Sequence, residues 1–204
     1  MSWATPLPPP PREWFPSLEV VRIDSGNLRG ATAHLQYLPP SNRVRTFEYR
    51  SNPIFSSGEA KDLIKTLGDH FNPLYLQTLR MRDISFEPTN RALEDIDLTP
   101  LLAFRRLEKI ILAFFGGTKG TPKTLSSIPT AWPKLRHLNL RPTNESPSTP
   151  DIDHTHLLEL AANLPHLRTL RLTFDATEMS VVPATHSLSC TLLWMARLSA
   201  IRRV

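Results

Sequence analysis

The chain has 204 residues, of which 40% are hydrophobic and 21% are charged, and this balance excludes wholesale disorder. Its 20 prolines and 7 glycines are about twice and about half the usual shares, and so few glycines argue against the phosphate-cradling loops of nucleotide-binding folds. The formal net charge of +5, with no run of basic residues longer than two, mildly favours an acidic partner, nucleic acid included.

The cysteine content and the N-terminal residues bear on localisation. The single Cys190 excludes an intrachain disulfide and a cysteine-based zinc site, and it fits a reducing compartment. The opening MSWATPLPPPP has neither the basic start nor the apolar stretch of a signal peptide. No apolar run approaches the roughly 20 residues of a membrane span. We therefore expect a cytoplasmic or nuclear chain with no membrane partner.

One block recurs along the chain and carries most of the structural prediction. Four copies are clear, and they read FPSLEVVRI (15–23), FRRLEKIIL (104–112), WPKLRHLNL (132–140) and LPHLRTLRL (164–172). Two weaker copies share its last part, VRTFEY (44–49) and LQTLRM (76–81). Each clear copy has an apolar residue, two spacer residues, a leading leucine, and further apolar residues at +3 and +5 from that leucine.

The spacing of the copies predicts the fold class. The leading positions lie about 26–32 residues apart, at Leu18, Val44, Leu76, Leu107, Leu135 and Leu167. This period is near that of the leucine-rich repeat, L-x-x-L-x-L. Residues at +3 and +5 face one side of a short strand and those at +2, +4 and +6 the other, so neighbouring strands must stack. The sequence predicts an α/β leucine-rich-repeat solenoid of about six strand–helix repeats, with a parallel inner sheet and helices outside.

The intervals between the strands predict helices. Three longer stretches fit, namely 56–71, 93–104 and 151–164. Ser56 or Ser57 is the candidate N-cap of the first, and the other two begin with acidic residues that suit a helix N-terminus. Leu125, Ile128 and Trp132 indicate a short helix in a further interval.

The same pattern divides the chain into segments. The leucine-rich-repeat domain is predicted to span residues 14–178. Residues 1–13 form a proline-rich leader, which we expect to be extended. In residues 179–204 the block does not continue, and this segment is either an off-pattern tail or a C-terminal cap.

Three phrases of the repeats resemble the leucine-rich-repeat portion of mushroom-type fungal F-box proteins. They are LTPLLAFRRLEKIIL (98–112), IPTAWPKLRHLNLRP (128–142) and HLLELAANLPHLRTLRLTFDAT (156–177). In that family an N-terminal F-box binds the adaptor of a cullin-type ubiquitin ligase, and the repeats select the substrate. The resemblance implies a protein–protein interaction module, the substrate-recognition part of an F-box-type ubiquitin ligase receptor. About 14 residues precede the first repeat, so we expect contact with a ligase adaptor only through an F-box that is missing from this chain.

The outward strand positions predict where a partner binds, on the concave face of the expected solenoid. The candidate partner-binding residues are Arg22, Arg50, Arg80, Arg82, Lys109, His137, Asn139, Arg141 and Arg171. Over all outward positions, seven residues are basic and two acidic, an excess equal to the +5 of the whole chain. Two interpretations remain, a solvated strand face whose arginine stems cover apolar surface, or a binding surface for an acidic or phosphorylated segment. The alternative function is a basic nucleic-acid-binding adaptor that uses the same face.

The sequence offers no catalytic set. Asp151, Asp153, His154 and His156 crowd together, but their spacing spreads them around a helix, and an acidic helix start explains the aspartates better than a metal site. The loop GGTKGT (116–121) lacks the order of a phosphate-binding P-loop, and no G-x-S-x-G motif is present. We therefore predict that the chain is not an enzyme and uses no cofactor or metal.

Overall fold

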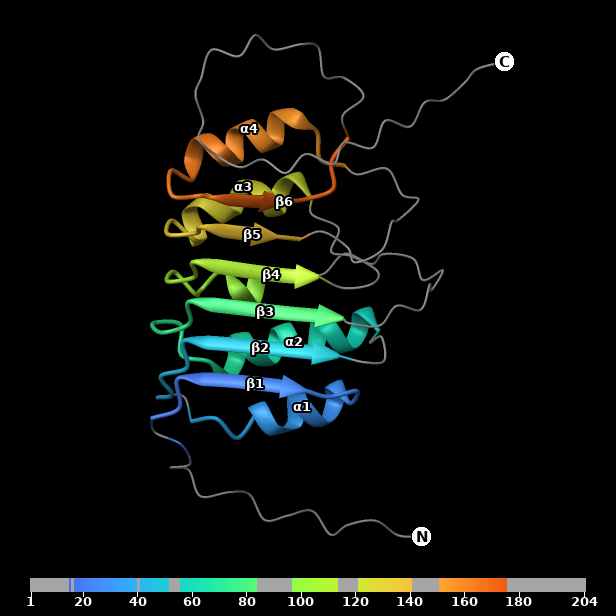
Figure 1. Cartoon of the computed structure of the whole chain (residues 1–204), viewed down its shortest axis with the longest axis vertical. Coiled ribbons are helices and arrows are strands. Elements are labelled where there is room, and N and C mark those ends of the chain that lie inside the picture. Colours follow the sequence, from blue (N-terminus) through green and yellow to red (C-terminus); the bar gives the residue numbers. More distant parts are fainter. Residues whose placement is uncertain are drawn as a thin grey trace, which may run out of the picture.

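The computed structural model describes residues 15, 17–39, 41–51, 56–83, 97–113, 121–140 and 151–175. These form an α/β fold with a six-stranded, all-parallel sheet whose strand order follows the chain. The strands are β1 (Val20–Asp24), β2 (Thr46–Ser51), β3 (Thr78–Asp83), β4 (Lys109–Ala113), β5 (His137–Asn139) and β6 (Thr169–Arg171). The intervening elements are α1 (Leu28–Leu35), α2 (Ser57–His70), the 3-10 helix η1 (Thr99–Leu101), α3 (Pro122–Ala131) and α4 (His154–Asn163). Neighbouring helices pack against one another beside the sheet. The strand–helix units therefore follow one another in chain order from one end of the molecule to the other (Figure 1). The predicted leader (1–13) and tail (179–204) lie outside the described residues.

Every strand begins two residues after the leading residue of its repeat, which confirms the predicted strand positions and their parallel pairing. The first residues of the six strands pair in one row across the sheet, Val20, Thr46, Thr78, Lys109, His137 and Thr169. The +3 residues of the inner strands are fully buried in the core beside the helices, and they are Phe47, Leu79, Ile110 and Leu138. In β1, which pairs only with β2 among the described strands, the equivalent Val21 is half-buried.

The backbone repeats one bonding pattern just before each strand. The carbonyl of Glu19 accepts the N–H groups of Arg45 at 2.8 Å and of Thr46 at 3.1 Å. The carbonyls at the same position of the next repeats each accept two N–H groups in the same way, and they belong to Arg45, Gln77, Glu108 and Arg136. Because main-chain atoms make these bonds, they hold each repeat on the next whatever side chains stand there.

The first apolar residue of each clear block closes a turn. The carbonyls of four such residues accept the N–H of the leading leucine at 3.0 Å, and they belong to Phe15, Phe104, Trp132 and Leu164. Trp132 is fully buried, and its indole Nε1 donates to the carbonyl of Leu101 at 3.1 Å. Phe15, in the first block, is 60% exposed. In three of the four clear blocks the turn therefore buries its apolar side chain in the core, and the strand begins after it.

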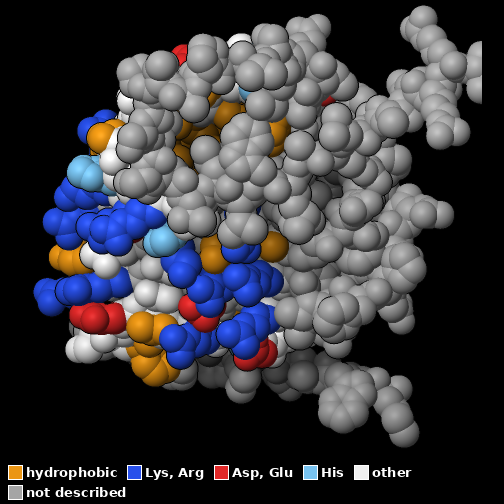
Figure 2. Space-filling model, turned by 45° about the horizontal axis from the view of Figure 1, so that its top comes forward, with side chains coloured by type: hydrophobic (Ala, Val, Ile, Leu, Met, Phe, Trp, Pro, Cys, Tyr) orange, Lys and Arg blue, Asp and Glu red, His pale blue; other side chains and the backbone are white. Residues whose placement is uncertain are grey.

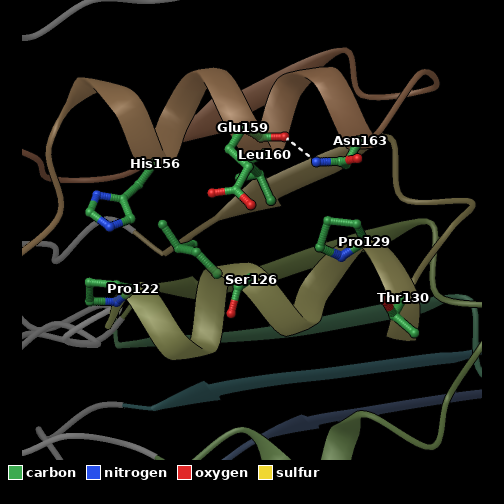
Figure 3. Close-up of a pocket in the computed structure, with 9 residues that line it drawn as sticks. Pro122, Ser126, Pro129, Thr130, His156, Glu159, Leu160 and Asn163 are labelled. Carbon is green, nitrogen blue, oxygen red and sulfur yellow. Dashed lines mark hydrogen bonds between the residues drawn. The ribbon is translucent and has the colours of Figure 1, made fainter.

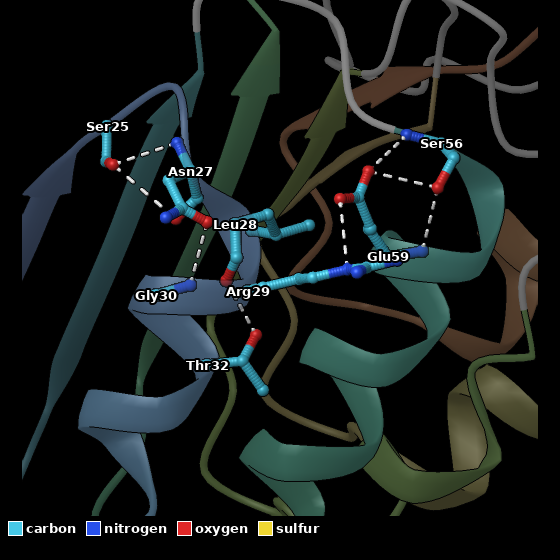
Figure 4. Close-up of polar contacts among 8 residues, drawn as sticks. All are labelled: Ser25, Asn27, Leu28, Arg29, Gly30, Thr32, Ser56 and Glu59. Carbon is cyan, nitrogen blue, oxygen red and sulfur yellow. Dashed lines mark hydrogen bonds and ion pairs between the residues drawn. The ribbon is translucent and has the colours of Figure 1, made fainter. Parts of the chain in front are cut away.

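The helices begin at side-chain caps (Figure 4). Ser56 and Glu59 form a capping box at α2, in which the Ser56 hydroxyl accepts the Glu59 N–H at 3.2 Å and the Glu59 carboxylate accepts the Ser56 N–H at 2.9 Å. At α1 the side chain of Asn27 accepts the N–H of Gly30 at 2.9 Å. Arg29 Nε lies 3.8 Å from the Glu59 carboxylate, which links the starts of the two helices.

One predicted helix is wrong in its described part. Of the stretch 93–104, the described residues 97–104 contain only η1. Pro100 has no N–H to donate, and the Asp97 carboxylate accepts the N–H of Thr99 at 2.8 Å, so the chain makes a single tight turn here instead of an α-helix. The other predicted helices are confirmed as α2, α3 and α4.

The register makes a prediction about the stability of adjacent residues in β5. Leu138 is fully buried, whereas His137 faces the other side of the sheet and is partly exposed. We expect Leu138→Ala to lower the free energy of unfolding by about 2–5 kcal/mol, because it leaves a cavity in the core. His137→Ala removes only a partly exposed hydrogen bond and costs about 1 kcal/mol at most. Urea unfolding measures both, and equal losses would contradict the register.

Gly68 marks a close approach between α2 and η1. A Cβ at this position would lie 2.8 Å from Pro100 Cβ, whereas at Gly58 of the same helix the nearest atom is Ser56 Oγ at 3.9 Å. We expect Gly58→Ala to stabilise the protein by up to about 1 kcal/mol, through the higher helix propensity of alanine. Gly68→Ala should destabilise it, because the backbone and ring of Pro100 must move. A stabilising effect of both changes in thermal unfolding would exclude this packing.

Candidate functional site

We call the sheet surface made by positions +2, +4 and +6 of the repeats the open face. Strand alternation turns these side chains away from the buried +3 and +5 residues. Among its described residues six are basic and two are acidic, and they are Arg22, Arg50, Arg80, Arg82, Lys109 and Arg171 with Asp24 and Glu48. Lys and Arg side chains crowd together over the strands with few acidic ones among them (Figure 2). Of the predicted partner-binding residues, only Arg141 lies outside the described residues.

Glu48 is the centre of the charges on β1, β2 and β3. In the register it stands between Arg22 and Arg80, and its carboxylate lies 3.4 Å from Arg22 Nε and 3.5 Å from a terminal nitrogen of Arg80. The side chain of Arg80 is 21% exposed, and Glu48 as a residue is only 9% exposed. A carboxylate this deeply placed depends on both cations for compensation.

Arg82 has a different environment. No carboxylate among the described residues lies within ion-pair distance of it, whereas Arg50 has Asp24 at 3.9 Å. Burial lowers the pKa of Arg82, and the positive charges of Arg80, Arg50 and Arg171 lower it further, against the opposing effect of Glu48. Among the described residues, positive charge is therefore concentrated at Arg82 without a counter-charge of its own.

Two arginine nitrogens on this face are buried donors without an acceptor. They are the Nε atoms of Arg80 and Arg82, and neither has a hydrogen-bond partner in the part of the chain that the structure describes. An unpaired buried donor is unfavourable, so both guanidinium groups gain when an oxygen acceptor arrives.

A second cationic group surrounds His137 on β5. Its Nδ1 lies 3.0 Å from Thr169 Oγ1. Burial lowers the pKa of His137, followed by the charges of Lys109, Arg168 and Arg136. Arg136 and Arg168 stand at +1 of their repeats, a position that the sequence prediction left out. The recurrence of arginine at +1 was the signal that could have found them.

Two outward positions, Glu48 and Ile111, are buried instead of solvated. Glu48 is covered by its two cations, and Ile111 on β4 is 7% exposed. Ile111 pairs in register with Arg80 on one side and Asn139 on the other. Long polar neighbours shield an apolar side chain in this way, since an arginine stem covers apolar surface while its head stays polar.

The cluster around residue 153 is a helix cap. The Asp153 carboxylate accepts the N–H of Thr155 at 2.9 Å and of His156 at 3.1 Å, and the same oxygen lies 2.7 Å from His156 Nδ1. The Thr155 hydroxyl also donates to this oxygen at 2.6 Å, and this bond above all, with the others, holds the pKa of Asp153 well below its usual range. Across the described ranges, no three His, Cys, Asp or Glu side chains come together as a metal site. The interpretation as a helix start is confirmed by the cap.

A small cleft lies between α3 and α4 (Figure 3). It encloses about 200 Å³ and is lined on one side by Pro122, Ser126 and Pro129 of α3. On the other side His156 already contacts Asp153, and the Asn163 side chain donates to a backbone carbonyl of the same helix. Two of its polar side chains, His156 and Asn163, are thus already engaged in the helix cap and within α4.

The comparisons with known proteins leave the open face to be interpreted from its own geometry. No family model matches the sequence, and no curated protein and no solved structure matches it. None of the described helices has the length and apolar character needed to cross a membrane.

The environment of His137 makes a prediction about pH. Because its pKa in the folded protein is lowered, the unfolded chain binds more protons between that pKa and the ordinary value of about 6.5. The contribution of His137 to stability is therefore complete above about pH 7 and is lost as the pH falls through this window. His137→Gln should reduce the loss of unfolding free energy on acidification, as urea unfolding over a pH series would measure. A variant with the same pH dependence as the wild type would contradict this.

Proposed function

We propose that the chain is a leucine-rich-repeat solenoid that binds another protein through the open face. The observation that carries the proposal is the single register of six parallel strands, which repeats outward positions side by side across the sheet. Repeat proteins use extended surfaces of this kind for binding. The excess of basic over acidic side chains on the open face favours an acidic or phosphorylated segment of the partner.

We also propose that this chain is not an enzyme and needs no cofactor. Many of its described polar residues are engaged in caps, in ion pairs and across the sheet. His137 and Thr169 lie 3.0 Å apart, as a base and a hydroxyl could, but no carboxylate of the described residues orients the imidazole. In catalytic sites that pair a nucleophile with a base, a third group orients the base.

The resemblance of the repeats to fungal F-box proteins supports a more specific role. In that role the open face is the substrate-recognition part of an F-box-type ubiquitin ligase receptor, acting in the cytoplasm or nucleus. The partner is then a protein to be ubiquitinated, and the basic side chains select its acidic or phosphorylated segment.

A nucleic-acid-binding adaptor is the second candidate, and the cations around His137 favour it. Lys109, Arg136 and Arg168 all lie close enough to affect the charge of that imidazole. Against it, the exposed carboxylate of Asp24 lies on the same face and would repel a continuous phosphate backbone. Salt separates the two, because nucleic-acid affinity falls steeply as salt rises and a packed protein interface weakens less.

The proposal is tested by capturing partners with a pair of charge-matched variants. Arg82→Ser with Arg171→Ser removes two open-face cations that form no ion pair with any described residue, and so leaves Glu48 compensated. The control, Arg29→Ser with Lys123→Ser, removes the same charge from exposed positions on α1 and α3.

We expect the open-face variant to lose by about tenfold or more the proteins that the wild type captures, and the control to retain them. Quantitative mass spectrometry of the captured proteins measures both, and thermal unfolding checks that both variants remain folded. Equal capture by the two variants would place the partner elsewhere on the molecule.

A further inference from the structure

Three arginines converge at the carboxyl ends of two neighbouring strands of the open face. Arg50 of β2 and Arg82 of β3 are partners in the register, and Arg80 stands two residues before Arg82 on the same side of β3. Strand geometry spaces such positions by about 4.8 Å across the sheet and by about 6.7 Å along a strand, so long arginine side chains from all three reach one point.

The negative charges near these arginines are unevenly shared. Glu48 contacts Arg22 and Arg80, and Asp24 lies 3.9 Å from Arg50. Arg82 contacts no described carboxylate, although the other guanidinium groups surround it. Among the described residues, the three arginines therefore carry more positive charge than the carboxylates neutralise. An added anion would neutralise most of this excess at Arg82.

The unpaired Nε atoms show how these side chains could receive an anion. A guanidinium binds an oxyanion best through two N–H groups at once. Within the described residues, Nε of Arg80 and of Arg82 bonds to nothing, so no hydrogen bond at these atoms prevents either side chain from turning toward a ligand. Both residues are partly exposed, which leaves a route from solvent.

We propose that Arg50, Arg80 and Arg82 form a subsite for a phosphate monoester carried by a phosphorylated segment of the protein partner. The proposal rests on the proposed function and names the group that this face recognises. A phosphate monoester has a charge near −2 and three free oxygens, one for each guanidinium, whereas a carboxylate has one charge and two oxygens. Arg82 makes the decisive contact, because Arg80 and Arg50 already have partial counter-charges.

The neighbouring acidic residues favour an isolated phosphate over a nucleic-acid backbone. A phosphodiester carries one charge per group, and its chain continues on both sides of each phosphate. Asp24 lies 3.9 Å from Arg50 with its side chain 72% exposed, and Glu48 lies between Arg22 and Arg80, so a backbone that continued past the arginines would meet the negative charge of Asp24. A single phosphorylated side chain can enter between them with its peptide passing at a distance.

The test uses a short alanine peptide with a central phosphoserine as the probe. The matched probes are the same peptide with glutamate in place of the phosphoserine, inorganic phosphate, and a single-stranded oligonucleotide. Binding is followed by calorimetry, and by the NMR signals of the arginine Nε–H groups, with the signal of Arg82 assigned as the one lost in Arg82→Gln.

We expect the phosphoserine peptide to shift the Arg82 Nε–H signal and inorganic phosphate to compete with it. Arg82→Gln should weaken binding by about tenfold or more, since it removes the decisive charged contact. Arg29→Gln, the same charge change at an arginine whose side chain is 88% exposed on α1, should leave binding unchanged.

Four results would overturn the subsite. Equal binding of the glutamate and phosphoserine peptides would mean that the face reads charge alone, and tighter binding of the oligonucleotide would favour nucleic acid. Equal weakening of peptide binding by Arg82→Gln and Arg29→Gln would mean that the effect comes from net charge alone. If partner capture still depends on Arg82 and Arg171 but survives phosphatase treatment of the partner, the subsite fails while the proposed function stands.

Discussion

Each strand of this sheet can bury its apolar side only by lying in register with its neighbours, and everything else in the structure depends on that constraint. A short strand with apolar residues at alternate positions has no core of its own. The row of +3 side chains that contains Phe47, Leu79 and Leu138 forms a shared core. The register of this row is set in each repeat by one backbone carbonyl that accepts two N–H groups of the next repeat. A slip by one residue would exchange the two faces. The register that buries Leu79 therefore also points Arg80 outward.

The strands could be predicted from sequence because their signal is local and repeated, and the exceptions have identifiable physical causes. Alternation of apolar residues marks the position of every described strand, and in the four clear blocks a turn precedes the leading residue. The tight turn at η1 was missed, because it depends on Pro100 and on the close approach of Gly68 from another element. The sequence also supplied the basic residues of the open face. It could not show which are neutralised, since the burial of Glu48 and the isolation of Arg82 depend on how side chains of three strands meet.

The pairing of charges on the open face gives its arginines different electrostatic environments. Glu48 forms ion pairs with Arg22 and Arg80, so these three side chains hold one another in place on the open face. Arg82 adds repulsion that the fold tolerates, because burial and three like charges all disfavour its charged form. Unfavourable electrostatics of this kind are typical of sites that are completed by a ligand. Net charge alone would have made all the arginines equivalent.

The spacing of the sheet also limits how a partner can be recognised. Neighbouring strands lie about 4.8 Å apart, whereas alternate residues of an extended peptide lie about 6.7 Å apart. A peptide that crosses the strands falls out of step with the repeats within a few residues, so it cannot pair one acidic side chain with each strand. Affinity must then come from a few points where charge is concentrated. Among its described residues the open face has two such points, one at Arg82 and one around His137. Of these, the first combines a cation that no described carboxylate compensates with buried donors that lack a described acceptor. An anionic group of high charge, held at that point while the remaining chain passes across the strands, satisfies both the spacing and the electrostatics.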